Sequence, residues 1–191
     1  MGKTGFTFHV FSTFLYIKLI EGGCSLVEWL NIRDRLNVFA RDLLLFPINL
    51  ADEGHWTLVV FLPASLQMFY VNSMVPLSRR RQQNDGKEVM ASICKYLDDE
   101  ASRLRKAKGE SDGGDVGFVP SVGFTVHIRQ AAELCGSSGV PQQANGYDCG
   151  VFVCAAILQL TRRCQLALQQ QQITEMRTWL VLCLAQARLF V

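Results

Sequence analysis

Residues 141–154 read PQQANGYDCGVFVC, and this stretch decides how the rest of the chain is interpreted. Nearly every side chain in residues 150–160 is apolar, so we predict a helix that begins at Cys149 and is buried on most sides. A thiol at a helix N-terminus faces unpaired backbone N–H groups and the positive end of the helix dipole, and both favour the thiolate. Cys149 is therefore a candidate nucleophile, and the alternative is a core thiol like Cys154 in the same helix. We expect Asp148 to cap this helix by accepting a backbone N–H.

Two other segments offer partners for this thiol. His55 lies between a turn and the apolar segment 56–62, where a strand can fix the ring beside a cleft. Asn72 ends the next strand-like segment, and strands that are adjacent in a hairpin would bring its side-chain carbonyl within reach of His55. Each residue alone also has a structural interpretation, a histidine fixed by the sheet and a turn asparagine. With Cys149 they supply the nucleophile, base and orienting group of covalent catalysis.

Gln143 lies six residues before Cys149, in the same stretch. A side-chain amide held beside the thiolate could donate a hydrogen bond to the oxyanion of an acyl intermediate. Loss of such a donor typically lowers the rate by about 100- to 1,000-fold. The sequence therefore offers a fourth component of a covalent catalytic site.

Composition excludes several other classes of protein. The chain has 191 residues, 49% of them hydrophobic and 19% charged, which suits one core and leads us to predict a single domain over residues 1–191. The net charge of +2 is too small to indicate nucleic acid, and no apolar run approaches the roughly 18 residues of a membrane-spanning helix. Seven cysteines without paired CxxC spacing indicate neither a disulfide framework nor a metal site, so we expect a reducing intracellular compartment.

Hydrophobic periodicity predicts an α+β fold. Strands are expected where short apolar or alternating segments lie between turn signals, the first three forming an antiparallel meander: residues 43–50, 56–62, 66–71 and 124–129. Helices are expected where apolar residues recur at helical spacing: residues 6–19, 24–40, 89–108 and 174–189. The alternation in the last strand turns His127 to solvent. Residues 109–123 are predicted to form an inserted surface loop, and the glutamine run at 169–172 a linker.

These segments resemble the Ulp1-type (C48) cysteine proteases, which process and deconjugate small ubiquitin-like modifiers. PQQANGYDCGVFVC is similar to that family's glutamine and cysteine motif, GHWTLVVF to its histidine strand, and MFYVNSM to the strand that ends in its acid. HVFSTFLYIKL and RDLLLFPINL extend the likeness over most of the chain. The resemblance implies a papain-like peptidase fold with a central, mostly antiparallel sheet packed with helices, and with the nucleophile at the N-terminus of a buried helix.

The resemblance also implies the chemistry. Cys149 is the expected nucleophile, His55 the general base and Gln143 the oxyanion donor. Asn72 stands where the family normally has aspartate. A neutral amide can still orient His55, as in papain-like Cys-His-Asn sites, but it stabilises the imidazolium less. The expected activity is that of a cysteine protease, and this departure puts its full strength in question.

Substrate recognition is implied in the same way. Trp56 resembles a wall of the narrow tunnel that accepts a Gly-Gly tail, and Asn145 and Gly146 are further expected substrate-binding residues. The partners would be a SUMO-like modifier, with a Nedd8-like one as the alternative, and its conjugates. We expect no cofactor, metal, nucleic acid or membrane, and a monomer in the nucleus or cytoplasm. The family's N-terminal segment, which supplies another tunnel tryptophan, has no counterpart, and Trp29 lies in a different predicted helix, so we interpret the chain as a partial protease domain.

Two other functions stay open. An inactive relative would keep the fold and bind the modifier without turnover, and its Cys149 would be an unreactive thiol with an ordinary pKa. A Cys-His acetyltransferase is the second alternative, since some bacterial effectors that resemble this family move acetyl groups with a similar site. The glutamine motif and Trp56 favour the protease.

Overall fold

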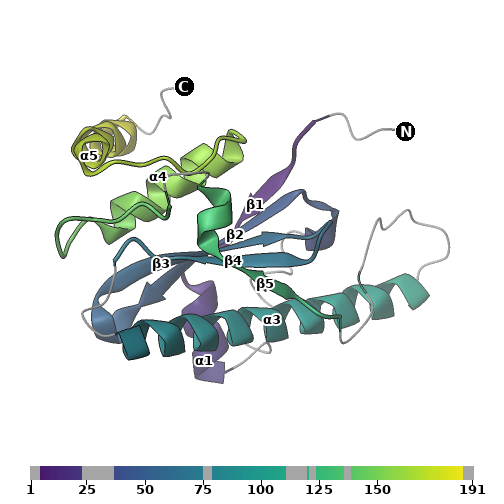
Figure 1. Ribbon diagram of the computed structural model, residues 1–191. Helices are drawn as coiled ribbons and strands as arrows, with labels where there is room; N and C mark the ends of the chain where they lie inside the picture. Colours follow the sequence, from purple (N-terminus) through teal and green to yellow (C-terminus); the bar gives the residue numbers. More distant parts are fainter. Residues whose placement is uncertain are drawn as a thin grey trace.

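The structure is a computed structural model that describes residues 5–22, 37–74, 79–110, 120, 124–135 and 139–186. In these residues a five-stranded sheet, in the order β1-β2-β3-β4-β5, lies between two layers of helices (Figure 1). The strands are β1 (Phe8–Val10), β2 (Leu43–Leu50), β3 (His55–Leu62), β4 (Gln67–Val71) and β5 (His127–Arg129). The helices are α1 (Leu15–Gly22), α3 (Arg79–Glu110), α4 (Cys149–Thr161) and α5 (Gln170–Ala185). The predicted α+β class is confirmed.

The sheet is mixed, and most of its paired residues are antiparallel, as predicted. Strands β2, β3 and β4 form the predicted antiparallel meander through short turns. The two outer strands pair in parallel, β1 with β2 and β5 with β4. Helix α1 lies between β1 and β2 in the chain, and α3 lies between β4 and β5. Such crossovers return the chain in its original direction and so produce parallel neighbours.

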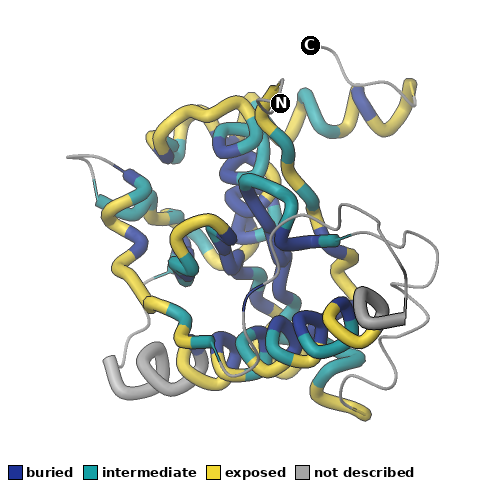
Figure 2. Tube along the Cα trace, turned by 90° about the vertical axis from the view of Figure 1, so that its right-hand side faces the viewer, coloured by how far each residue is buried: buried dark blue, intermediate teal, exposed yellow. Residues whose placement is uncertain are grey.

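Strand β2 supplies side chains to the core on both faces of the sheet. Successive residues of a strand point to opposite faces. Leu44 and Phe46 pack into the core beneath α1 and α3, and Leu43 and Leu45 pack into the core beneath α4. All four are buried. Figure 2 shows that buried positions follow the strands and the helix sides that face them. The run without polar side chains over residues 43–48 of β2 is what a strand covered on both faces requires.

The predicted helix over residues 6–19 is wrong in its first half. That part contains strand β1, and α1 begins only at Leu15. Asp42, just before β2, accepts hydrogen bonds from the Thr7 backbone N–H and from the Thr7 hydroxyl, both at 2.8 Å. The Phe11 N–H then donates to the Leu45 carbonyl at 2.9 Å. Pairing with a distant strand thus overrides the helical spacing of the apolar residues.

Two helix boundaries and the burial of one strand also differ from prediction. Helix α5 begins at Gln170, so the glutamine run is the first turn of a helix rather than a linker. Helix α3 begins at Arg79, ahead of the predicted start, and ends at Glu110. Strand β5 turns His127 to solvent, as predicted, but Ile128 is 58% exposed, so the expected half-buried strand is wrong at that position.

Two predicted segments lie mostly outside the described residues. Of the predicted helix over 24–40, including Trp29, only residues 37–40 are described, and they hold a short 3-10 turn, Val38–Ala40. Of the predicted loop over 109–123, residues 109 and 110 end α3, and Pro120 is the other described position.

Candidate active site

Strands β3 and β4 bring His55 and Asn72 together. His55 begins β3, and Asn72 follows the last residue of β4. The antiparallel register pairs Leu58 with Val71, so the start of one strand lies beside the end of the other. The His55 ring is 6% exposed, and its Nε2 lies 2.8 Å from Asn72 Oδ1. The hairpin therefore makes the contact between the two side chains that the sequence predicted.

The Met74 backbone fixes the orientation of the Asn72 amide. Its N–H donates to the same Oδ1 at 2.9 Å. A backbone N–H can only donate, so the Asn72 atom that faces both groups is the accepting oxygen. His55 Nε2 must then carry a proton, which leaves Nδ1 unprotonated in the neutral ring. Among the described residues Nδ1 is buried and has no hydrogen-bond partner, so it is available to accept a proton.

Cys149 is the first residue of α4, as predicted, and it is 4% exposed. It lines a cleft of about 700 Å³ together with Trp56, Gly146 and Tyr147. A Cβ atom added to Gly150 would lie 3.6 Å from Trp56 Cδ1, so the indole packs against the helix backbone next to the thiol. The structure thus places the predicted nucleophile, the predicted tunnel tryptophan and Gly146 around one cleft.

Hydrogen bonds tie the segment before α4 to the end of β4. The Gln143 N–H donates to the Ser73 carbonyl at 2.6 Å, and the Ser73 hydroxyl donates to Gln143 Oε1 at 2.8 Å. Gln143 Nε2 donates to the Asn145 carbonyl at 2.5 Å, and Gln142 Nε2 donates to the Asn72 carbonyl at 3.2 Å. These bonds bring the predicted oxyanion donor to the strand end that carries the predicted orienting amide.

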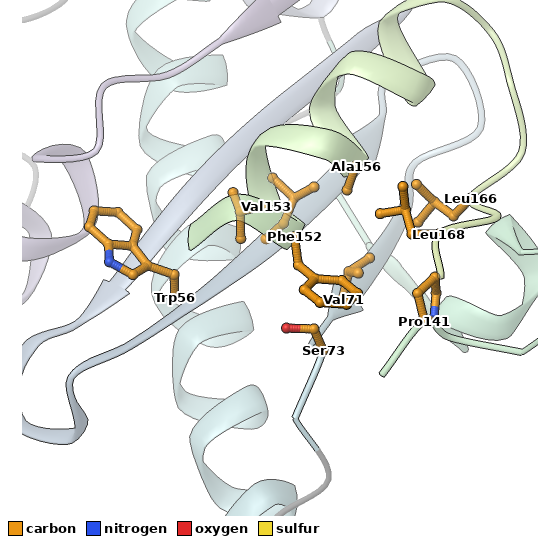
Figure 3. Close-up of a pocket in the computed structure, with 10 residues that line it drawn as sticks. Trp56, Val71, Ser73, Pro141, Phe152, Val153, Ala156, Leu166 and Leu168 are labelled. Atoms are coloured by element: carbon orange, nitrogen blue, oxygen red, sulfur yellow. The ribbon is translucent and has the colours of Figure 1, made fainter. Parts of the chain in front are cut away.

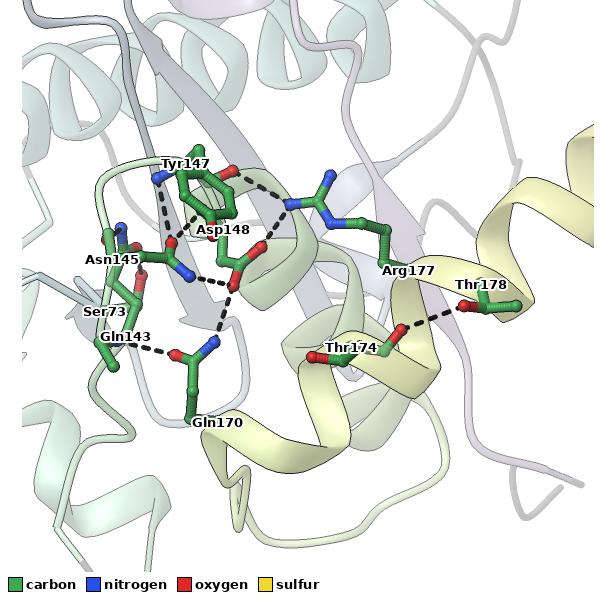
Figure 4. Close-up of polar contacts among 10 residues, drawn as sticks. Ser73, Gln143, Asn145, Tyr147, Asp148, Gln170, Thr174, Arg177 and Thr178 are labelled. Atoms are coloured by element: carbon green, nitrogen blue, oxygen red, sulfur yellow. Dashed lines mark hydrogen bonds and ion pairs between the residues drawn. The ribbon is translucent and has the colours of Figure 1, made fainter.

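The Asp148 side chain does not cap α4, so that prediction is wrong. Its backbone is already helical, with φ −94° and ψ 0°, whereas a capping residue is typically extended and turns its side chain back onto the helix. The buried carboxylate instead accepts from Asn145 Nδ2 at 2.6 Å and Gln170 Nε2 at 2.7 Å, and it forms an ion pair with Arg177 (Figure 4). Burial disfavours the charged carboxylate, but bonds from Arg177, Asn145 and Gln170 outweigh it and hold the pKa of Asp148 below its ordinary value.

Asn145 forms hydrogen bonds within the segment that precedes α4. Its Oδ1 accepts from the Tyr147 N–H at 3.1 Å and from the Asp148 N–H at 3.0 Å. Its Nδ2 and its carbonyl are engaged by Asp148 and Gln143. The structure therefore gives Asn145 internal contacts, and its predicted contact with substrate remains a prediction.

Sequence reasoning missed three residues of this site, which are Ser73, Gln170 and Arg177. One signal for Arg177 was available. It falls within the apolar stripe of α5, one turn after Ile173, which is fully buried. A charged residue on a buried stripe indicates a partner, and the pattern gives no information on which one.

The comparison with known families decides the class of protein. The profile of the "Ulp1 protease family, C-terminal catalytic domain" matches residues 4–182. The chain belongs to this protease family. Sentrin-specific protease 2 from Homo sapiens is 30% identical to this Ulp1-family chain over 174 residues, 91% of the chain and 25% of the human protein. Ubiquitin-like-specific protease ESD4 from Arabidopsis thaliana is 25% identical over 174 residues, 88% of the chain and 30% of the plant protein. The Ulp1-family chain thus spans about a quarter of the length of these relatives.

Solved structures show the same fold. The C-terminal Ulp1 protease domain in complex with Smt3, the yeast ortholog of SUMO, is 22% identical to this Ulp1-family chain with a TM-score of 0.65, and the match covers 90% of this chain and 64% of that one. The Ulp1-like SUMO protease catalytic domain of Chaetomium thermophilum is 23% identical with a TM-score of 0.55, covering 90% and 58%. The predicted family and fold are therefore confirmed.

In the described part of this Ulp1-family chain, no three histidine, cysteine or carboxylate side chains are grouped as metal ligands would be. Over the same residues, no helix combines the length and the apolarity that crossing a bilayer requires. The described cysteines are all free thiols: Cys94, Cys135, Cys149, Cys154, Cys164 and Cys183.

Proposed function

We propose that the chain is the catalytic part of a cysteine peptidase that cleaves after the Gly-Gly tail of a ubiquitin-like modifier, most closely SUMO. The observation that carries this proposal is the His55–Asn72 pair at the start of the central strand β3, whose geometry leaves His55 Nδ1 without a hydrogen-bond partner among the described residues. In the same chain Cys149 is the first residue of α4 and lines a cleft. The Ulp1 domain solved with Smt3 supports a SUMO-like substrate. We also propose that residues 1–191 form one protease domain that acts in a reducing compartment, the nucleus or the cytoplasm.

The proposed reaction begins with proton transfer from the Cys149 thiol to His55 Nδ1. The thiolate attacks the carbonyl carbon of the terminal glycine, and the carbonyl oxygen becomes an oxyanion that Gln143 Nε2 stabilises by donating a hydrogen bond. When the C–N bond breaks, Nδ1–H protonates the leaving lysine amine, and a thioester remains. A water molecule then loses a proton to Nδ1 and attacks the thioester, which releases the glycine carboxylate and restores Cys149. Asn72 Oδ1 holds Nε2–H throughout, so only Nδ1 exchanges protons.

The cleft supports selection of glycine. Trp56 packs against Gly150, beside the nucleophile, and so narrows the approach to Cys149. A diglycine tail has no side chains, and it would fit where a bulkier peptide is rejected by steric overlap. The proposed specificity is therefore for the flexible C-terminal tail of a folded modifier rather than for an ordinary peptide.

A covalent probe tests the proposal. Each modifier (SUMO-like, Nedd8-like and ubiquitin) is prepared with a thiol-reactive group at its terminal glycine, and adducts are detected by intact mass. The matched control is Cys154→Ser, because Cys154 lines the same cleft. We expect an adduct with the SUMO-like probe that is lost in Cys149→Ser and retained in Cys154→Ser. A folded chain that forms no adduct with any probe would contradict the proposal.

A second candidate is a modifier-binding module with weak or no turnover. Asn72 favours it, because the neutral amide lacks the charge that would stabilise an imidazolium at His55. Such a module would bind the unreactive modifier without forming the adduct. An acetyltransferase would instead transfer label from acetyl-CoA to Cys149, so the same mass measurement separates the three functions.

A further inference from the structure

We propose that Ser73 is a positioning residue that orients the Gln143 amide toward the oxyanion, and this inference rests on the function proposed above. The Ser73 side chain is buried, and its hydroxyl donates to Gln143 Oε1 at 2.8 Å. Its carbonyl accepts the Gln143 backbone N–H at 2.6 Å. Ser73 thus holds both the backbone and the side chain of Gln143.

The orientation of the amide follows from the chemistry of its two partners. The Asn145 carbonyl can only accept, so the Gln143 atom 2.5 Å from it is the amino nitrogen. The oxygen must then face Ser73, whose hydroxyl acts as the donor. Nε2 has two hydrogens, and the Asn145 carbonyl takes one, which leaves the second for an oxyanion. Without the Ser73 hydroxyl the amide would lose the bond that holds its oxygen away from the reacting carbonyl.

The surroundings strengthen this bond. Ser73 lies at the edge of a cavity of about 10 Å³ whose other walls include Val71, Pro141 and Phe152 (Figure 3). A cavity needs about 10–15 Å³ and several polar partners to hold a water molecule, so this apolar space does not favour one. Water therefore competes little with Gln143 for the Ser73 hydroxyl, and a hydrogen bond in such a medium is electrostatically stronger than in water.

The same strand end serves the base and the oxyanion donor. Asn72 orients His55, and the next residue, Ser73, orients Gln143. Gln142 adds a further bond to the Asn72 carbonyl at 3.2 Å. The end of β4 therefore fixes the distance between His55, the proposed base, and Gln143, the proposed oxyanion donor.

Steady-state cleavage of a modifier fusion tests the role of Ser73. We expect Ser73→Ala to lower kcat by at least about 10-fold, toward the loss of about 100- to 1,000-fold that follows removal of an oxyanion donor, with KM little changed. Ser73→Thr keeps a hydroxyl and should retain more activity. The matched control is Ser65→Ala, since Ser65 also donates to a glutamine, Gln67 Oε1 at 3.3 Å, in the exposed turn before β4. An unchanged kcat in Ser73→Ala would overturn the inference.

Two further measurements separate positioning from folding. Alkylation of Cys149 by iodoacetamide forms no carbonyl oxyanion, so its rate should be unchanged in Ser73→Ala even though kcat falls. In a Gln143→Ala background the Ser73→Ala change should lower kcat no further, because the two residues act through one amide. Equal losses in both backgrounds, or a parallel loss of alkylation, would refute positioning. If Ser73→Ala lowers the Tm, we would use Ser73→Cys in its place. Cysteine is close to serine in size, but its thiol is only a weak hydrogen-bond donor.

A wild-type chain that cleaves no modifier would contradict the proposed function, and the positioning of Gln143 would still be measurable. In isotope-labelled NMR spectra the side-chain amide of Gln143 should show slow exchange with water in the wild type. Ser73→Ala should change the chemical shifts and the water-exchange rate of the Gln143 side-chain amide to those of an exposed glutamine. Ser65→Ala should leave both unchanged. Gln143 signals that are the same in wild type and Ser73→Ala would overturn the inference whatever the activity.

Discussion

The carboxylate of Asp148, the residue before the proposed nucleophile, is paired with the guanidinium of Arg177 on α5. The carboxylate is 6% exposed and the guanidinium side chain 47% exposed. Arg177 also donates to the Tyr147 carbonyl at 3.2 Å, and its charge lies 5.9 Å from the centre of the Tyr147 ring. A helix that supplies none of the proposed reacting groups thus holds the start of α4 in place.

Replacing Arg177 should destabilise the chain. Arg177→Met leaves a buried carboxylate with amide donors alone. Breaking a fully buried pair costs about 3–5 kcal/mol, and because Arg177 is 47% exposed we expect about 1–3 kcal/mol in urea denaturation. The matched control is Arg129→Met, since Arg129 is equally exposed at 47% and its partner Glu133 is 41% exposed. That surface pair should change stability by at most about 1 kcal/mol. Equal effects of the two substitutions would contradict the prediction.

The Asp148 contacts should make stability depend on pH in the acid range. A carboxylate whose pKa is lowered by folding contributes stability above its unfolded pKa of about 3.9, and that stability is lost as pH falls through the folded value. Wild type should therefore exceed Asp148→Asn in free energy of unfolding by a constant amount between about pH 6 and 8. Below about pH 4 the difference should shrink. A difference that is the same at every pH would show that the charge of Asp148 contributes nothing.

Asn72→Asp should raise turnover. The substituted carboxylate can accept from His55 Nε2–H and from the Met74 N–H as Asn72 Oδ1 does, so the geometry is retained. A charged acceptor strengthens such a bond by about 1 kcal/mol or more and stabilises the imidazolium, so we expect kcat/KM to rise by about 5- to 10-fold. An unchanged or lower rate would mean that the amide is not the weak point of the site.

Thiol alkylation should distinguish Cys149 from the other cysteines. Burial raises the pKa of the Cys94, Cys135 and Cys154 thiols. In the proposed mechanism His55 Nδ1 accepts the Cys149 proton, so iodoacetamide at about pH 7 should modify Cys149 first. Peptide mapping of the wild type checks the order, and His55→Ala should abolish the preference. Preferential labelling of Cys154 would contradict the proposed thiol–imidazole pairing.

Several features follow from local sequence alone. The apolar run 43–50 forms β2 with the predicted bounds, and α4 starts at the predicted Cys149. The contact of His55 with Asn72 was also predictable, because a short antiparallel hairpin fixes which ends of its strands are neighbours. These features depend on residues that are close in the chain, and periodicity and turn signals describe such neighbours well.

Other features were decided by segments that are far apart in the chain. The apolar residues around residues 8–10 recur at helical spacing. The segment nevertheless forms a strand because β2, 35 positions later, supplies its hydrogen bonds. The Asp148 side chain does not cap α4 because it pairs with Arg177, which lies 29 positions later on α5. Gln170, on the same helix, also donates to it. Ser73 and Gln143 are 70 positions apart, and no local pattern relates them. The sequence by itself therefore determined the family, the meander and the candidates for the reacting residues, and tertiary packing decided which polar groups hold those candidates, because these partners meet only when the layers assemble.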